Sequence, residues 1–398
     1  MTSKVTAISI PPVNNGLVMT KKYRSMKRLL MLSGLCFRQC SDSTVKQRFQ
    51  TLRLLLSLLF ISLVGYQIGT FIWFLFHLTE YDGRVSRTVV MTIWSMKAFF
   101  SMVFLFYWEL RGYNRRILER TMCYELDETK TNQSDKTTRT LLTGFVVVSI
   151  VTSTICSAAI MANRFGYTDV EFLLLDMLTV AYGNTSIGPT IVLTINFFAF
   201  SVFNIVLVYF VVSTASIRVK IGTEEPTSSY DQLQVIYVEF RRVIRIIRET
   251  NSIFEVYTFV SLGTNIPLCV FSMLTFFMSM NSNIWDMVYS IPELSFVFIE
   301  VIGLTFTPAS VRNILSRVEP MIYENSKIWL SFHEKTFEIA QLYINMAKQS
   351  DLGISIWGFA ILDKPIILTT ASLTVSYFVL IVQMGQQPST HHNATMTV

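Results

Sequence analysis

The sequence has very little charge. Charged residues make up 15% of the 398, whereas apolar residues make up 51%, and a typical soluble domain carries roughly 25% charged residues. Too few polar side chains are present to cover a globule in water, so lipid must cover much of the surface. No Pro-, Gly- or Ser-rich linker and no internal repeat divides the chain. We therefore predict one membrane domain and exclude a soluble fold.

Signatures of catalysis and of metal binding are also missing. Only four histidines occur, two of them adjacent in the tail, and H-E-x-x-H, G-x-S-x-G, phosphate-loop and dinucleotide-binding motifs do not occur. Basic segments alternate with apolar runs, which does not fit a nucleic-acid surface. We expect a protein that is not an enzyme, with no cofactor, no metal and no nucleic-acid partner.

Long apolar runs are what the sequence does have. A helix needs about 20 apolar residues to cross ~30 Å of hydrocarbon. Seven runs approach this length, and the sixth is the shortest and contains Glu293 and Glu300. They cover 54–78, 89–107, 141–162, 191–212, 256–280, 289–306 and 366–384. We predict an all-α fold with seven transmembrane helices within 51–384, flanked by tails at 1–50 and 385–398.

The basic residues predict the orientation. Of the 33 Lys and Arg residues, 28 lie in the tail 1–50 or in the loops that follow the second, fourth and sixth spans. Only three lie in the other set of loops. Because Lys and Arg are enriched in cytosolic loops, we expect the N-terminus inside and the C-terminus outside the cell.

Two glycosylation sequons agree with this orientation. Asn184 and Asn393 begin N-x-S/T sequons in segments expected outside, where the glycosylation machinery acts. A third sequon begins at Asn132 in a loop expected to be cytosolic. We predict glycosylation at the first two only.

Two stretches expected in the cytosol have helical periodicity. Apolar residues recur every three or four positions in 231–254, with four arginines between them, and again in 328–349. Such a helix packs on neighbouring helices or lies on acidic lipid, and we favour packing. We expect Pro320 and Pro365 each to end a helix.

Charged residues within spans are candidate functional groups. Lys97 in the second span and Glu300 in the sixth lie farthest from water. They either face a hydrated ligand or ion site, or pair inside the bundle with each other or with carbonyl groups, or Lys97 extends to the membrane interface. Trp73 and Trp94 are placed to stack on a ligand or to lie at the membrane interface.

The end of the chain resembles the C-terminal signature of the invertebrate gustatory receptors. The resemblance rests on Gly358-Phe359-Ala360-Ile361-Leu362-Asp363, on Ile366-Ile367-Leu368 and on the run from Ser376 to Met384. The family signature has Thr-Tyr, five hydrophobic residues and Gln-Phe. Here Tyr377 and Gln383 match it, while Ser376 replaces Thr and Met384 replaces Phe.

The resemblance implies a ligand-gated, non-selective cation channel of four subunits, homomeric or formed with related receptors. The last helix of each subunit would line the pore, and 231–254 and 310–365 would form a cytosolic anchor. It also implies a small-molecule tastant as ligand and the plasma membrane of sensory neurons as location. One branch of the family senses light and peroxide instead.

The last span fits a pore helix. Ser376, Leu380, Gln383 and Met384 share one face through their i, i+4, i+7 and i+8 spacing. A ring of leucines can close a pore by dewetting, and a ring of amides can replace ion hydration. The alternative is that this face only packs on other helices.

Two other classes of membrane protein fit the sequence less well. A G-protein-coupled receptor would place its N-terminus outside, in conflict with the charge distribution. A secondary transporter would show matched broken helices in two halves, and Pro267 and Pro292 are not such a pair.

Overall fold

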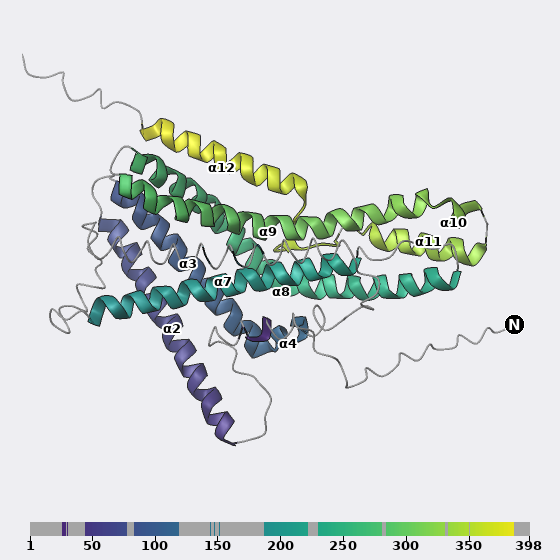
Figure 1. Cartoon of the computed structure of the whole chain (residues 1–398), viewed down its shortest axis with the longest axis horizontal. Coiled ribbons are helices and arrows are strands. Elements are labelled where there is room, and N and C mark those ends of the chain that lie inside the picture. The colour runs from purple at the N-terminus through teal and green to yellow at the C-terminus, as the bar shows by residue number, and fades with distance from the viewer. Residues whose placement is uncertain are drawn as a thin grey trace, which may run out of the picture.

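The computed structural model describes residues 26–28, 30, 44–77, 83–118, 144, 147, 151, 187–221, 230–280, 284–330, 333–349 and 351–385. These residues are almost all helical. The helices are α2 (Thr44–His77), α3 (Gly83–Arg111), α4 (Tyr113–Ile117), α7 (Ile187–Ile221), α8 (Tyr230–Met280), α9 (Ile284–Glu324), α10 (Ser326–Leu330), α11 (Glu334–Ala347) and α12 (Lys364–Gly385). A short hairpin of β1 (Ser355–Ile356) and β2 (Ala360–Ile361) precedes α12 (Figure 1).

Six of the described helices are long and apolar enough to cross a membrane: α2, α3, α7, α8, α9 and α12. They correspond to six of the seven predicted spans, and the chain is a multi-pass membrane protein. The predicted third span, 141–162, lies almost entirely outside the described residues. Helix α2 begins at Thr44, earlier than the apolar run at 54–78 and within the predicted tail.

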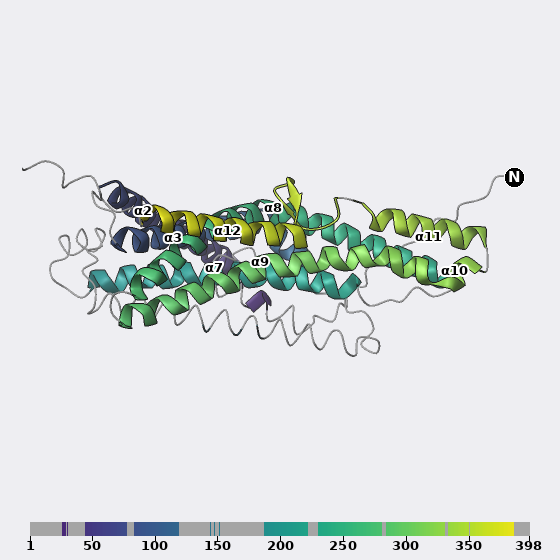
Figure 2. The same cartoon turned by 90° about the horizontal axis from the view of Figure 1, so that it is seen from above.

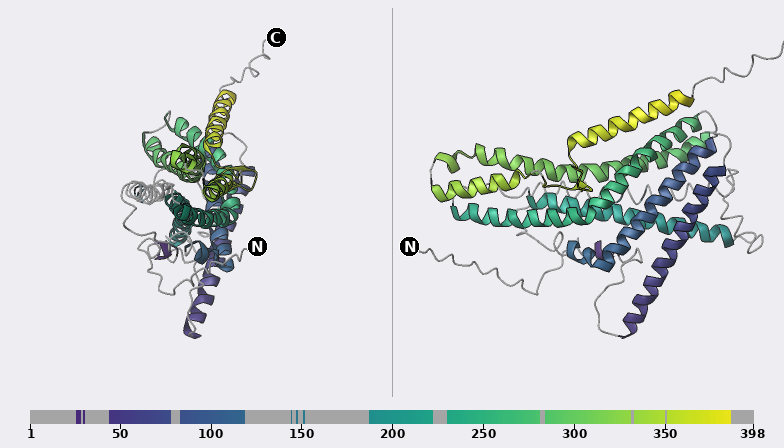
Figure 3. Two further views of the ribbon diagram at one scale, coloured as in Figure 1. Left: turned by 90° about the vertical axis from the view of Figure 1, so that its right-hand side faces the viewer. Right: turned by 180° about the vertical axis from the view of Figure 1, so that it is seen from behind.

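The membrane bundle is held together by one apolar core. Helices α3, α7, α8 and α9 pack against one another, and their facing residues form a continuous cluster of buried side chains. Helix α2 contacts α3 and α7 from outside and projects beyond the bundle at one end (Figure 3). Helix α12 lies along the opposite side, next to α8 (Figures 1 and 2).

A second apolar core lies where α8 and α9 extend beyond the other spans. The first half of α8 and the last turns of α9 pack against α10 and α11 there (Figure 2). The rings of Phe240 and Tyr343 meet with centroids 4.5 Å apart. We call the first half of α8, the last turns of α9, α10 and α11 together the anchor bundle. The helix predicted over 231–254 is confirmed, and its apolar stripe packs on neighbouring helices. The stretch 328–349 is helical in two pieces, α10 and α11.

The prediction that Pro320 and Pro365 end helices was wrong. Pro320 lies inside α9, which continues to Glu324. A proline removes one N–H from the helix ladder, and the buried Val318 and Ile322 on either side hold the helix in the anchor bundle. Pro365 is the second residue of α12, near a helix start, where the missing N–H has little effect.

The hairpin 355–361 was not predicted from the sequence. Its turn residues Trp357 and Gly358 have φ angles of 47° and 72°. Left-handed conformations at two successive turn residues suit a tight hairpin, and glycine adopts them without steric cost. Trp357 carries the strain of that conformation.

Candidate functional site

An ion pair lies buried in the centre of the membrane bundle. Lys97 Nζ on α3 is 2.7 Å from both carboxylate oxygens of Glu300 on α9. The two side chains are 2% and 0% exposed. Lys97 also donates a hydrogen bond to Oδ1 of Asn265 on α8. Three helices are therefore joined through one ammonium group, in a place where an unpaired charge would be very costly.

An aromatic cluster covers one side of the pair. The ring of Trp94, one turn before Lys97 on α3, lies 5.2 Å from Phe200 and 5.8 Å from Phe203, both on α7. Its centroid is 5.1 Å from Phe296, one turn before Glu300 on α9. Lys97 Nζ lies 5.5 Å from the Trp94 ring and 5.8 Å from that of Phe203. These distances are within the range of cation–π attraction.

Two further polar residues of α8 lie buried near the pair, Asn265 and Tyr257, each 1% exposed. The amide of Asn265 also interacts with Glu300, and the hydroxyl of Tyr257 interacts with Ser261, one turn along α8. Buried polar groups are nearly always satisfied in this way.

A row of polar side chains runs from the pair toward the end of α8 at Met280. Asn265, Ser272 and Thr275 share a face of α8. Ser272 Oγ donates to Glu293 Oε1 at 3.0 Å, about two turns from Glu300 on α9. The hydroxyls of Thr275 and of Ser86, near the start of α3, are hydrogen-bonded. We call these side chains the polar row.

The structure brings together three of the four residues predicted for a ligand pocket. Trp94, Lys97 and Glu300 lie in contact, as the mutual-pairing alternative required. Trp73 lies on α2 with half of its surface exposed, apart from this cluster. Asn265 was missed, although an amide within the apolar run 256–280 was a signal that could have found it. The sequons at Asn132, Asn184 and Asn393 lie outside the described residues.

Most of the surface of the predicted pore helix α12 is exposed in the single chain. Only 6% of an apolar stretch of 18 residues in this helix is buried. Its contact side with α8 includes the buried Thr374. The half-buried Phe378 lies on the same side, and its ring is 5.3 Å from that of Phe277. At about 100° per residue, Ser376 and Gln383 lie about 160° and 180° from Thr374.

Three of the four predicted pore residues are thus exposed. Ser376, Leu380 and Gln383 all lie away from α8, while Ile381 is half-buried on the α8 side. Tyr377 of the family motif is 49% exposed. Met384 lies in the last turn of α12, and its side chain is outside the described part of the structure.

The hairpin attaches α12 to α8. Oδ1 of Asn251 accepts hydrogen bonds from the backbone N–H of Ser355 at 2.6 Å and from its hydroxyl at 3.0 Å. The N–H of Trp357 donates to the carbonyl of Glu255 at 3.2 Å. Oδ1 of Asp363 then caps α12 by accepting from the N–H of Ile366. Helix α8 therefore carries both Asn265, which binds Lys97 of the buried pair, and the attachment point of α12.

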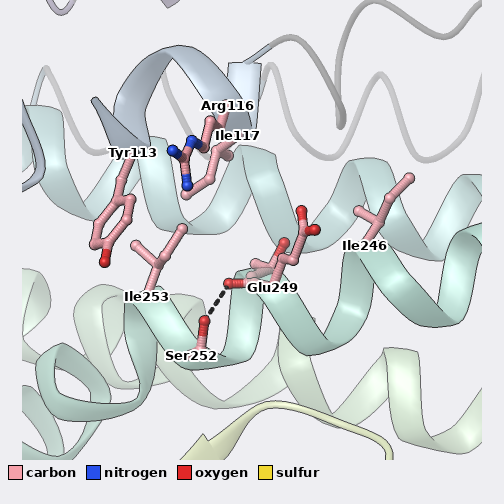
Figure 4. Close-up of a pocket in the computed structure, with 8 residues that line it drawn as sticks. Tyr113, Arg116, Ile117, Ile246, Glu249, Ser252 and Ile253 are labelled. Atoms are coloured by element: carbon pink, nitrogen blue, oxygen red, sulfur yellow. Dashed lines mark hydrogen bonds between the residues drawn. The ribbon is translucent and has the colours of Figure 1, made fainter. Parts of the chain in front are cut away.

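A separate cavity of about 210 Å³ lies between α4 and α8, beside the anchor bundle (Figure 4). Arg116 of α4 and Glu249 of α8 contribute opposite charges to its lining. Ser252 donates to the carbonyl of Glu249 at 3.0 Å. None of the pore or ligand-pocket residues predicted from the sequence lines this cavity.

Comparisons with known proteins extend these observations. No family model matches the sequence, and no curated protein sequence matches it. The fold is similar to two solved structures of the insect olfactory receptor OR5 from Machilis hrabei. The complex with eugenol gives a TM-score of 0.70 at 15% identity and covers 92% of this chain and 98% of the receptor. A second structure of the same receptor gives a TM-score of 0.67 at the same identity and coverage. At this identity the likeness shows that the two proteins share a fold.

Proposed function

We propose that this chain is a subunit of a chemosensory cation channel that opens when a small molecule binds within the subunit. The channel is a tetramer in the plasma membrane of a sensory neuron, with the N-terminus in the cytosol, and its stimulus is a tastant. The shared fold with an olfactory receptor that binds eugenol supports a chemosensory role. The resemblance of the C-terminal motif favours the gustatory branch.

The observation that carries the channel proposal is the exposure of α12. This helix is long and apolar enough to span a membrane, yet within the described part of the chain it packs mainly along α8. A peripheral helix of this kind is stable in lipid, but its outer face then needs no polar residues. Instead Ser376 and Gln383 lie opposite α8. Polar residues on that side are expected where the helices of several subunits surround water.

Closure of the pore is assigned to Leu380. Four leucine side chains around a narrow axis form an apolar collar from which water withdraws, and ions that keep their hydration cannot pass. Gln383, about one turn along the helix, supplies amide groups that interact with a permeating cation without binding it tightly. Tyr377 and Met384 flank these positions.

Coupling to the ligand is assigned to α8. A ligand that disturbs Lys97, Asn265 or Glu300 acts directly on this helix. The same helix holds the hairpin through Asn251, and the hairpin leads into α12 within a few residues. Movement of α8 at the buried pair therefore reaches the base of the pore helix through fixed hydrogen bonds.

Whole-cell recording of matched variants tests the gate. Leu380→Ala widens and wets the collar, so we expect current without ligand. Ile381→Ala is the control, because Ile381 packs toward α8, and it should affect stability without opening the pore. Gln383→Ala should change relative permeability among cations while the resting channel stays closed.

Two other results would contradict the assignment of the gate or of the channel. If Leu380→Ala and Ile381→Ala both reach the cell surface and both stay silent at rest, α12 is a packing helix. Currents that disappear when G-protein signalling is blocked would instead assign the chain to a receptor acting through a protein partner.

A further inference from the structure

We propose that the cavity between α4 and α8 binds the headgroup of phosphatidylethanolamine, a zwitterionic phospholipid with a primary ammonium group. This lipid site is separate from the proposed channel function and requires only that the chain spans a membrane. Three features support the assignment: the level of the cavity relative to the spans, the opposite charges in its lining, and an exposed apolar stripe that leads to it.

The cavity lies at the level where the chain leaves the membrane. Helix α4 follows the span α3 after the single residue Gly112, whose φ of 70° turns the chain. Along the long axis of the molecule, α4 lies at about the same level as the hairpin that leads into α12 (Figures 1 and 3). Arg111 ends α3, and α4 adds Arg115 and Arg116, all three of them exposed. Arginines at this level are placed to bind lipid phosphates.

The lining of the cavity carries one charge of each sign. Arg116 of α4 and Glu249 of α8 extend into the space between the two helices (Figure 4). The Arg116 guanidinium lies 6.0 Å from the centre of the Tyr113 ring, and a guanidinium beside a ring still directs its N–H groups outward in its own plane, where they fit a phosphate. A headgroup with net negative charge would be repelled by Glu249. A zwitterionic headgroup can place its phosphate at Arg116 and its cation at Glu249.

The groups around Glu249 favour a primary ammonium over a quaternary one. A primary ammonium has three N–H donors, and the hydroxyls of Thr250 and Ser252 lie in the same lining as acceptors. Because a carboxylate accepts several hydrogen bonds, Glu249 can bind the ammonium in addition to its other partners. A quaternary ammonium donates no hydrogen bond and is recognised by cages of aromatic rings. Among the described residues of this lining, Tyr113 is the one aromatic ring.

The cavity has room for a headgroup and lies next to a surface for acyl chains. Its volume of about 210 Å³ is several times the ~30 Å³ that a water molecule occupies in the liquid. On α3 the exposed side chains of Val103, Tyr107 and Leu110 form an apolar stripe through their i, i+4 and i+7 spacing. The ring of Tyr107 lies 6.2 Å from that of Tyr113 in the cavity lining. Acyl chains that lie on this stripe therefore bring their headgroup to the cavity.

The test is the retention of lipid by the purified full-length protein in detergent, measured by native mass spectrometry. Dioleoyl phosphatidylethanolamine, phosphatidylcholine and phosphatidylglycerol are offered at equal concentrations, so that only the headgroup differs. Wild type should retain phosphatidylethanolamine in preference to the other two. Arg116→Gln removes the phosphate contact and should lower this retention on the order of tenfold. Glu249→Gln removes the carboxylate that repels an anionic headgroup, so the preference over phosphatidylglycerol should disappear.

Arg317→Gln is the matched control, because Arg317 is exposed on α9 and does not line the cavity. It should retain the lipids as wild type does. Ser252→Phe, at an exposed position of the lining, fills the cavity without a change of charge and should also lower the retention of phosphatidylethanolamine.

The proposal is overturned if wild type retains the three lipids equally, or if Arg116→Gln retains phosphatidylethanolamine as wild type does. Displacement of the lipid by millimolar inorganic phosphate would also overturn it, because the cavity would then hold a soluble anion. None of these measurements involves conduction, so their failure leaves the Leu380 currents as the separate test of the channel.

Discussion

Removing one member of the Lys97–Glu300 pair should destabilise the protein far more than removing both. A buried pair broken on one side costs about 3–5 kcal/mol, whereas its replacement by two apolar residues is often neutral or stabilising. Lys97→Met and Glu300→Leu keep approximately the original volumes. The double variant Lys97→Met/Glu300→Leu should therefore be close to wild type, and the cycle should give a coupling energy of several kcal/mol.

The two single variants should also differ from each other. In Glu300→Leu, the ammonium of Lys97 keeps its bond to Asn265 and its contacts with the rings of Trp94 and Phe203. Contacts of the latter kind are worth about 0.5–2 kcal/mol each. In Lys97→Met, the carboxylate of Glu300 keeps only the nearby amide of Asn265. We therefore expect Lys97→Met to be the less stable variant.

The assay is the Tm of the full-length protein in detergent. The Tm is measured as the temperature at which half of the monodisperse protein is lost on heating. Additive losses in the double variant would refute the reasoning, because they would mean that the two charges are stabilised independently. If wild type, the two single variants and the double variant were equally stable, the pair would have to be in contact with water. Both results would remove the basis for treating this site as dry and charge-balanced.

Further predictions concern the hairpin and the orientation. Asn251→Ala removes two hydrogen bonds to Ser355 and should weaken ligand-evoked current while surface expression, measured by antibody labelling, is retained; unchanged currents would exclude this route of coupling. Single Asn→Gln variants treated with a glycosidase should reveal sugar on Asn184 and Asn393 and none on Asn132. Sugar on Asn132 would mean that the predicted topology is reversed.

Much of the membrane fold could be predicted from the sequence. Apolar runs of about 20 residues have few alternatives to a spanning helix, and six predicted spans coincide with described helices. The apolar stripe of 231–254 likewise predicted a packed helix. The boundaries were less certain, because polar residues extend helices beyond the lipid, as at Thr44 and at Glu324.

The candidate site was predicted in part. Lys97 and Glu300 attract notice as charges in apolar surroundings, but the sequence leaves open whether they meet. Asn265 escaped notice because it carries no charge, and the sequence search singled out charged residues within spans. The hairpin at 355–361 escaped notice because it is too short for a periodic pattern, and it is held by Asn251 from a distant part of the sequence. Long-range contacts of this kind are set by packing.

The most direct test of the channel proposal is conduction by the purified chain alone in a planar lipid bilayer. The account predicts unitary cation currents, rare in wild type without a ligand and frequent in Leu380→Ala. Because no other protein is present, such currents exclude signalling through a partner. A bilayer that contains folded Leu380→Ala protein and passes no current under any cation gradient would contradict the account.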